Sequence, residues 1–112
     1  MNRQQTWAES AFGRVRSIKT GGDQSKYRTH ALKFPSLLLQ SGLAQAVAFV
    51  QSRDTSGAMF VQHLAETLGQ PNLPAAARTA GLGEYVRLSS DALAVSAWYR
   101  RFAQTELEGG DQ

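Results

Sequence analysis

The amino-acid sequence predicts an all-α protein, folded as a single compact bundle of five to six helices. Apolar residues recur at helical spacing in successive segments, and clusters of glycine, proline, aspartate and serine separate those segments. No segment alternates strictly between apolar and polar residues over five or more positions, as a half-buried strand would. With 112 residues, 42% of them hydrophobic, the chain can bury one core. We therefore expect one helical domain over residues 1–107 and a disordered tail at residues 108–112.

The first predicted helix covers residues 4–19, and a glycine-containing turn at residues 20–23 ends it. Its apolar stripe consists of Trp7, Ala8, Ala11, Phe12, Val15 and Ile18. A second helix begins near Ser25, and Pro35 should kink it or split it in two, because proline removes a backbone donor. Its inner face is expected to hold Tyr27, Ala31, Phe34 and Leu38.

A break at Ser41-Gly42 precedes the third predicted helix, over residues 43–52. Its inward residues are expected to be Ala44, Val47, Ala48 and Phe49. Residues 54–57 form a turn rich in capping residues before a fourth helix, which ends at Gly69. The apolar side chains of that helix are Met59, Phe60, Leu64, Ala65 and Leu68.

Two helices complete the predicted bundle. Pro74 suits the first position of a short helix at residues 75–80, which two glycines then close. Those glycines are Gly81 and Gly83. Ser89 or Ser90 is expected to cap the last helix, over residues 91–107. Its apolar residues are Leu93, Ala94, Ala97, Trp98, Phe102 and Ala103.

Charge is distributed unevenly along the chain. Residues 1–53 carry a net charge of +6 and residues 54–112 carry −3, which together give the formal charge of +3. A basic first half favours an anionic partner such as a nucleic acid. Cysteine is absent, which excludes disulfides and thiol chemistry and suits a reducing compartment. The sequence shows no signal peptide and no apolar run long enough to span a bilayer, so we expect a cytoplasmic protein.

The sequence contains no recognisable catalytic pattern. Its glycine pairs lack the Lys-Ser or Lys-Thr of a phosphate-binding loop, and its acidic residues are scattered. We therefore expect no catalytic residue, no metal and no cofactor. A histidine-dependent ribonuclease stays as an alternative, because imidazole titrates near neutrality. It would cleave RNA alone, and His30→Ala or His63→Ala would abolish the cleavage.

Two clusters combine cations with aromatic rings: residues 26–33 and residues 98–102. The cations are suited to neutralise phosphates, and an exposed ring is suited to stack on a base. The alternative is that the rings anchor the core and the cations are their solvated neighbours. Pro35 and Gly42 are expected to set the angles between successive helices, and Trp98 to anchor the last helix.

Three stretches, in this order and spacing, resemble a known family. They are Lys26-Tyr27-Arg28 leading through Leu32-Lys33 to Pro35, Ser41-Gly42-Leu43-Ala44-Gln45 followed by Ala48-Phe49, and Ala97-Trp98-Tyr99-Arg100-Arg101-Phe102-Ala103. Together with the first helix they span residues 7–105. The sequence resembles the small-subunit family of the type III-B CRISPR effector, called the Cmr complex.

The resemblance implies a non-catalytic, all-helical subunit of an RNA-guided complex that serves antiviral defence. Its partners would be guide RNA, target RNA, the backbone and large subunits, and further copies of itself stacked head to tail. Specificity would come from base pairing between guide and target, so the protein would contact only the RNA backbone. The residues expected at that backbone are Lys26, Arg28, Lys33, Arg100 and Arg101, with Arg14, Arg16 and Lys19 behind them.

Stacking would bring the acidic second half against a basic patch of the next copy, an interface that charge reversal at Glu66 and Glu84 would test. The competing class is a small basic helical DNA-binding regulator, which the charge allows. Against it, no clear helix-turn-helix spacing leads into a polar, base-reading helix.

Overall fold

The computed structural model describes residues 1–20 and 23–109, which form six helices and no strand. The helices are α1 (Arg3–Ile18), α2 (Gln24–Ser41), α3 (Leu43–Arg53), α4 (Thr55–Leu68), α5 (Leu73–Thr79) and α6 (Leu82–Glu106). This confirms the all-α bundle. Residues 21–22 of the predicted turn and residues 110–112 of the predicted tail lie outside the described residues.

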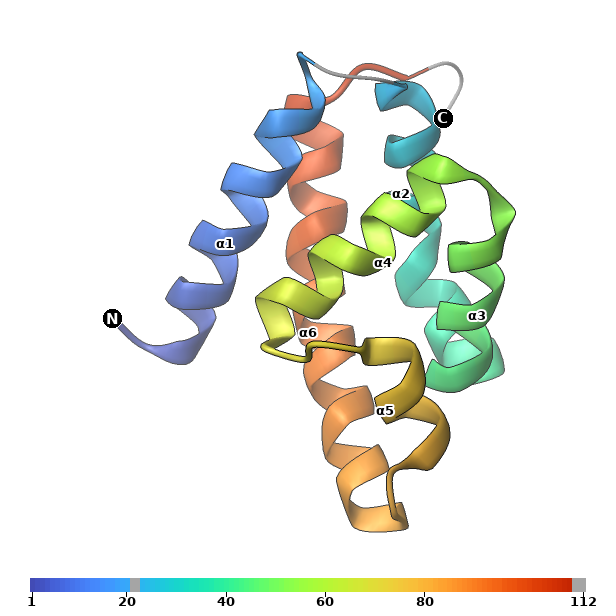
Figure 1. Ribbon diagram of the computed structural model, residues 1–112. Helices are drawn as coiled ribbons and strands as arrows, with labels where there is room; N and C mark the ends of the chain where they lie inside the picture. The colour runs from blue at the N-terminus through green and yellow to red at the C-terminus, as the bar shows by residue number, and fades with distance from the viewer. Residues whose placement is uncertain (21–22, 110–112) are drawn as a thin grey trace.

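Helix α6 is the longest element, and α1, α2 and α4 all pack against it (Figure 1). Helix α1 runs parallel to the second part of α6: Arg3 at the start of α1 pairs with Asp91 in the middle of α6, and Arg16 near the end of α1 pairs with Glu106 at the end of α6. Helix α4 crosses in front of α6, and α5 with the start of α6 forms the end of the molecule away from the described C-terminal residues. No helix in the described part of the chain is long and apolar enough to cross a membrane.

Four buried aromatic rings form the centre of the core. Phe60 of α4 contacts Tyr27 and Phe34 of α2 and Tyr99 of α6, with ring centroids 5.3 to 5.7 Å apart. All four side chains are at most 1% exposed. The predicted inner face of α2 is confirmed, since Tyr27, Ala31, Phe34 and Leu38 are all buried.

Several predicted boundaries are confirmed by their capping geometry. Gly42, with φ of +84°, separates α2 from α3, and a side chain there would meet Tyr85 Oη at 3.4 Å. Asp54 caps α4 by accepting a hydrogen bond from the Gly57 amide. Gly69, in the left-handed region, ends α4 and donates to carbonyls of the last turn.

The prediction for the start of the last helix was wrong. Helix α6 begins at Leu82, so Ser89 and Ser90 lie inside it and cap nothing. Gly83 stands in the first turn, where it does not interrupt the helix, and Leu88 extends the buried stripe backward from Ala92. The inner face also differs: Tyr99 is buried, whereas Ala97 is exposed and Trp98 is half-buried. Helix α6 packs against α2 and α4 as well as α1, and the predicted Trp98 and Phe102 lie on its side toward α1, where they meet Gln4 and Phe12.

Pro35 lies inside α2, which continues through it, so the predicted split does not occur. In α3 the buried residues are Leu43, Ala46, Val47 and Val50. The prediction that Ala48 and Phe49 point inward was wrong: both are exposed, Phe49 by 54%.

Candidate nucleic-acid interface

A groove between α2 and α3 brings three cations together. It has a volume of about 590 Å³, and Lys26, Lys33 and Arg53 line it. Lys26 and Lys33 are seven residues apart, so two turns of α2 place them on the same side of the helix. Arg53 lies in the last turn of α3. All three are accessible to solvent, and we call this surface the α2–α3 groove.

Phe49 places an exposed aromatic ring in the α2–α3 groove. The guanidinium of Arg53, one helical turn further along α3, lies 5.9 Å from the centre of that ring. Neither residue was predicted as part of the site. The available signal was their i, i+4 spacing, which places a cation and a ring side by side on a helix.

One end of the groove is formed by a hydrogen-bonded pair that the sequence did not predict. His30 Nε2 lies 2.9 Å from Asp54 Oδ1, and the same carboxylate accepts the Gly57 amide at 2.7 Å. These hydrogen bonds, that from Gly57 above all, hold the pKa of Asp54 below its usual range. His30 therefore stabilises the position of the Asp54 side chain that caps α4.

Two of the eight predicted RNA-contacting cations, Arg28 and Arg14, are buried or half-buried and bonded to other parts of the protein. Arg28 is 8% exposed and its Nε donates to the Ala103 carbonyl at 3.3 Å, so it ties α2 to the last turn of α6. Arg14 is half-buried, and its Nε pairs with Glu66 Oε1 at 2.9 Å. This pairing lowers the pKa of Glu66.

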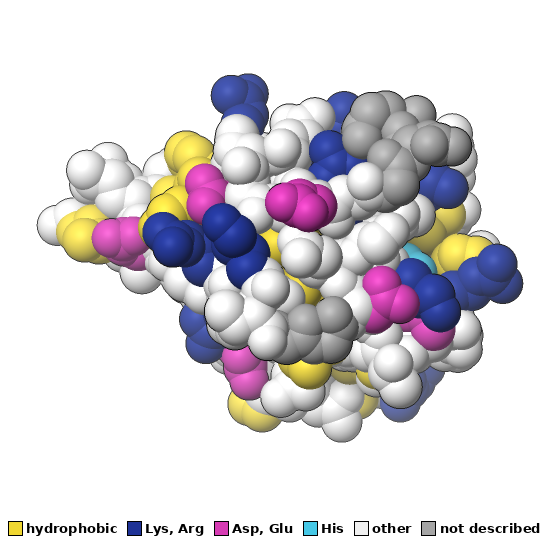
Figure 2. Space-filling view, turned by 90° about the horizontal axis from the view of Figure 1, so that it is seen from above, with side chains coloured by type: hydrophobic (Ala, Val, Ile, Leu, Met, Phe, Trp, Pro, Cys, Tyr) yellow, Lys and Arg dark blue, Asp and Glu magenta, His cyan; other side chains and the backbone are white. Residues whose placement is uncertain are grey.

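The other predicted cations outside the groove do not form one patch. Arg100 donates to the Leu32 carbonyl at 2.6 Å, on the α2 side of α6. Arg101 lies on the outer side of α6, and Arg16 lies 4.0 Å from Glu106. Lys19 follows the end of α1. Figure 2 shows Lys and Arg side chains in separate groups with acidic side chains between them.

A buried polar network surrounds His63, which is 9% exposed. Its Nδ1 lies 2.8 Å from the Tyr27 hydroxyl, and the Tyr99 hydroxyl donates to its carbonyl at 3.0 Å. Burial raises the pKa of both tyrosines, that of Tyr99 to about 12, so both hydroxyls stay protonated. Burial also lowers the pKa of His63, against the attraction of Glu66. His63 is therefore a neutral core residue. Within the described residues, no group of three or more histidine, cysteine, aspartate or glutamate side chains is placed to hold a metal ion.

Acidification should destabilise the protein through His63. The unfolded chain binds a proton on this side chain at a pKa of about 6.5, whereas the folded protein binds it only at lower pH. The free energy of unfolding should therefore fall from about pH 7 to about pH 5, by at most about 1.4 kcal/mol per pH unit. Urea unfolding across this range measures the slope. His63→Gln should flatten it, and an unchanged slope in that variant would contradict the assignment.

Known proteins resemble this chain over nearly its whole length. The family described as "CRISPR-associated protein (Cas_Cmr5)" matches residues 3–106. The CRISPR system Cmr subunit Cmr5 of Thermus thermophilus is 42% identical over 110 residues, which cover 95% of this chain and 96% of that protein. The crystal structure of a CRISPR-associated Cmr5 family protein from the same organism superposes with a TM-score of 0.93 at 41% identity, over 96% of this chain and all of that one. These matches confirm the resemblance seen in the sequence: the chain belongs to the Cmr5 family of CRISPR-associated proteins.

Proposed function

We propose that this chain is a non-catalytic small subunit of a type III-B CRISPR Cmr complex, which contacts the RNA backbone without reading its sequence. The observation that carries the proposal is the match to a Cmr subunit over almost the whole of both chains. The absence of a catalytic pattern in the sequence agrees with it, and so does the engagement of both histidines in structural hydrogen bonds. The complex would act in the cytoplasm, in antiviral defence.

The α2–α3 groove is the surface that we assign to RNA. Lys26, Lys33 and Arg53 present three cations from two adjacent helices, and Phe49 adds an exposed ring. Phosphate contacts of this kind position a nucleic acid without specifying sequence. Arg100 would extend the surface across α2, whereas Arg28 and Arg14 would act indirectly by holding the helices in place.

Copies of the subunit would stack head to tail through the end of the molecule formed by α5 and the start of α6. That end exposes Leu82 by 82% and Val86 by 58%, with Glu84 between them. A second copy would bury these apolar side chains and offer a cation to Glu84. Glu84→Arg tests this more cleanly than a change at Glu66, which would also break the pair with Arg14.

Affinity purification of the tagged chain from the cells that encode it, at moderate salt, tests the proposed function. Recovery of other Cmr-type proteins with a short RNA of uniform length is the expected result. Recovery of the chain alone, or with duplex DNA from one promoter, would reject the proposal and favour the DNA-binding regulator. RNA cleavage by the isolated chain that His30→Ala abolishes would favour the ribonuclease.

Removing two cations of the groove should weaken binding of the isolated protein to an RNA duplex of any sequence. Each lost phosphate contact lowers the slope of log affinity against log salt by about 0.7 to 0.9. Lys26→Ala/Lys33→Ala should therefore lower the slope by about 1.4 to 1.8 if both side chains contact phosphates. Filter binding at several salt concentrations measures the slope.

The matched control is Arg78→Ala/Arg87→Ala, which removes the same charge from exposed positions on α5 and α6 outside the groove. Equal losses in the two double variants would show that net charge, and not the α2–α3 groove, determines binding.

A further inference from the structure

A second surface, on the outer side of α1 and α6, combines aromatic rings with arginine. A shallow hollow of about 470 Å³ there is lined by Gln4 of α1 and by four residues of α6, which are Ala94, Ala97, Trp98 and Arg101. The α6 residues follow helical spacing, so they form one stripe along the helix. The two alanines leave space beside the indole. We call this surface the Trp98 hollow.

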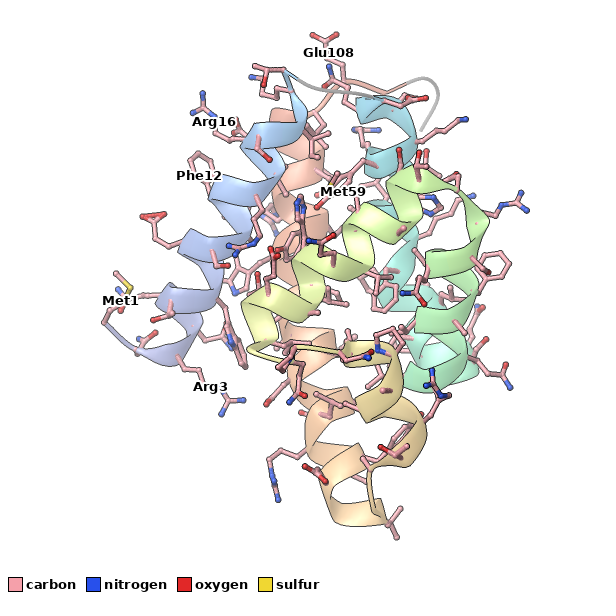
Figure 3. The ribbon with its side chains drawn as sticks, in the orientation of Figure 1. Met1, Arg3, Phe12, Arg16, Met59 and Glu108 are labelled. Carbon is pink, nitrogen blue, oxygen red and sulfur yellow. The ribbon has the colours of Figure 1, made fainter. Side chains whose placement is uncertain are left out.

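The indole of Trp98 is held in a defined orientation. Its Nε1 donates to Gln4 Oε1 at 2.8 Å, which links α6 to the start of α1. Phe102 stacks on the indole with ring centroids 5.7 Å apart and an interplanar angle of 21°, and Phe12 meets Phe102 edge-on at 5.2 Å. Figure 3 shows Phe12 and Arg16 on the outer side of α1. Since Phe102 does not line the hollow, the hollow borders the part of the indole that Phe102 leaves uncovered.

The polar groups around the hollow match those of a nucleotide. The hydrogen bond from Trp98 uses the amide oxygen of Gln4, so the amide NH2 remains a donor for a base edge. Arg101 is exposed and forms no ion pair among the described residues, so its guanidinium is available to a phosphate. A flat ring that entered the hollow would lie against the part of the indole that Phe102 does not cover.

We propose that the Trp98 hollow binds an unpaired base of single-stranded RNA, with Arg101 on the adjoining phosphate. Stacking on an aromatic side chain requires a base that is free of its own neighbours, so this ligand differs from the duplex expected in the α2–α3 groove. The charge of Arg101 favours a nucleic acid over an apolar protein surface as the occupant. The inference depends on the proposed function only in taking RNA as the ligand.

Fluorescence of Trp98 tests the inference directly. In a Trp7→Phe background, where Trp98 is the one tryptophan, a single-stranded oligoadenylate at low salt should quench the emission to saturation. A blunt RNA duplex of the same total length should quench it far less. Ala97→Glu, at an exposed position of the hollow, should raise the dissociation constant at least about tenfold, since a stacked base contributes on this scale. Ala58→Glu, on the exposed side of α4, adds the same charge elsewhere and should leave the quenching unchanged.

Absence of quenching by the oligoadenylate would overturn the inference, as would equal quenching by the duplex or an Ala97→Glu variant that behaves like Ala58→Glu. Sedimentation measures whether the protein self-associates. Self-association that quenches Trp98 in the absence of RNA would overturn the inference and assign the hollow to contact between protein copies. The Lys26→Ala/Lys33→Ala variant separates the two proposals. If this variant still shows quenching by the oligoadenylate and its salt slope for duplex RNA is unchanged, the assignment of the groove is rejected and that of the hollow stands. If the parent protein shows no quenching but the variant has a lower salt slope for duplex RNA, the assignment of the hollow is rejected and that of the groove stands.

Discussion

Phe60→Ala should destabilise the protein by about 3–5 kcal/mol, a large share of the stability expected for a domain of this size. The side chain is fully buried and meets three other rings, from α2 and from α6. Truncation removes those contacts and leaves a cavity that three helices cannot close without moving. Urea unfolding followed by circular dichroism measures the loss.

Phe49→Ala is the matched control, because it removes the same ring from a position that is 54% exposed. We expect its cost to stay below about 1 kcal/mol. A loss of similar size in both variants would contradict the assignment of Phe60 to the centre of the core.

Gly57→Ala should also be strongly destabilising, for a different reason. A Cβ at this position would lie 2.1 Å from the Val50 carbonyl oxygen, so the backbones of α3 and α4 would have to separate. Forced repacking of this kind costs about 1–3 kcal/mol, which exceeds the gain of up to about 1 kcal/mol from replacing glycine by alanine in a helix. Thermal unfolding of the variant should show a clear decrease in midpoint.

Gly13→Ala should change the thermal unfolding midpoint in the opposite direction. Nothing lies within 4 Å of a Cβ at Gly13 in α1, so only the gain in helix propensity applies, and the midpoint should rise. If both substitutions raise the midpoint, the close approach of α3 and α4 at Gly57 is not present in solution.

The helices could be predicted from the sequence because their signals are local. Period-3.6 stripes identified α1, α2 and α4, and Gly42, Asp54 and Gly69 marked boundaries through their own backbone and capping preferences. The start of α6 was misplaced because Gly81 and Gly83 resemble a stop, while the packing that continues the helix involves residues distant in sequence. Tyr85 shows this: its hydroxyl accepts the Ala44 amide at 3.2 Å, from the first turn of α3.

The candidate site was harder to predict, because the identity of a cation says little about where its charged end lies. Arg28 and Lys26 are two residues apart, yet one is buried against the carbonyl of Ala103 and the other is exposed on the groove. The difference arises from which neighbouring helix each side of α2 faces. The pairing of His30 with Asp54 was invisible for the same reason, since 24 residues separate them.

The hydrogen bonds of Asp54 affect the entropic cost of binding a ligand in the α2–α3 groove. The Asp54 carboxylate accepts the Gly57 amide at the start of α4 and pairs with His30 of α2, while the Tyr85 hydroxyl accepts the Ala44 amide at the other end of α3. The backbone of the groove is thus braced at both ends before anything binds. Ordering a mobile backbone costs about 1–2 kcal/mol per residue, and a braced one avoids that penalty. Only the ends of the lysine and arginine side chains would lose conformational freedom on binding. The entropic cost of binding a polyanion would therefore be small, even though the groove carries few charges.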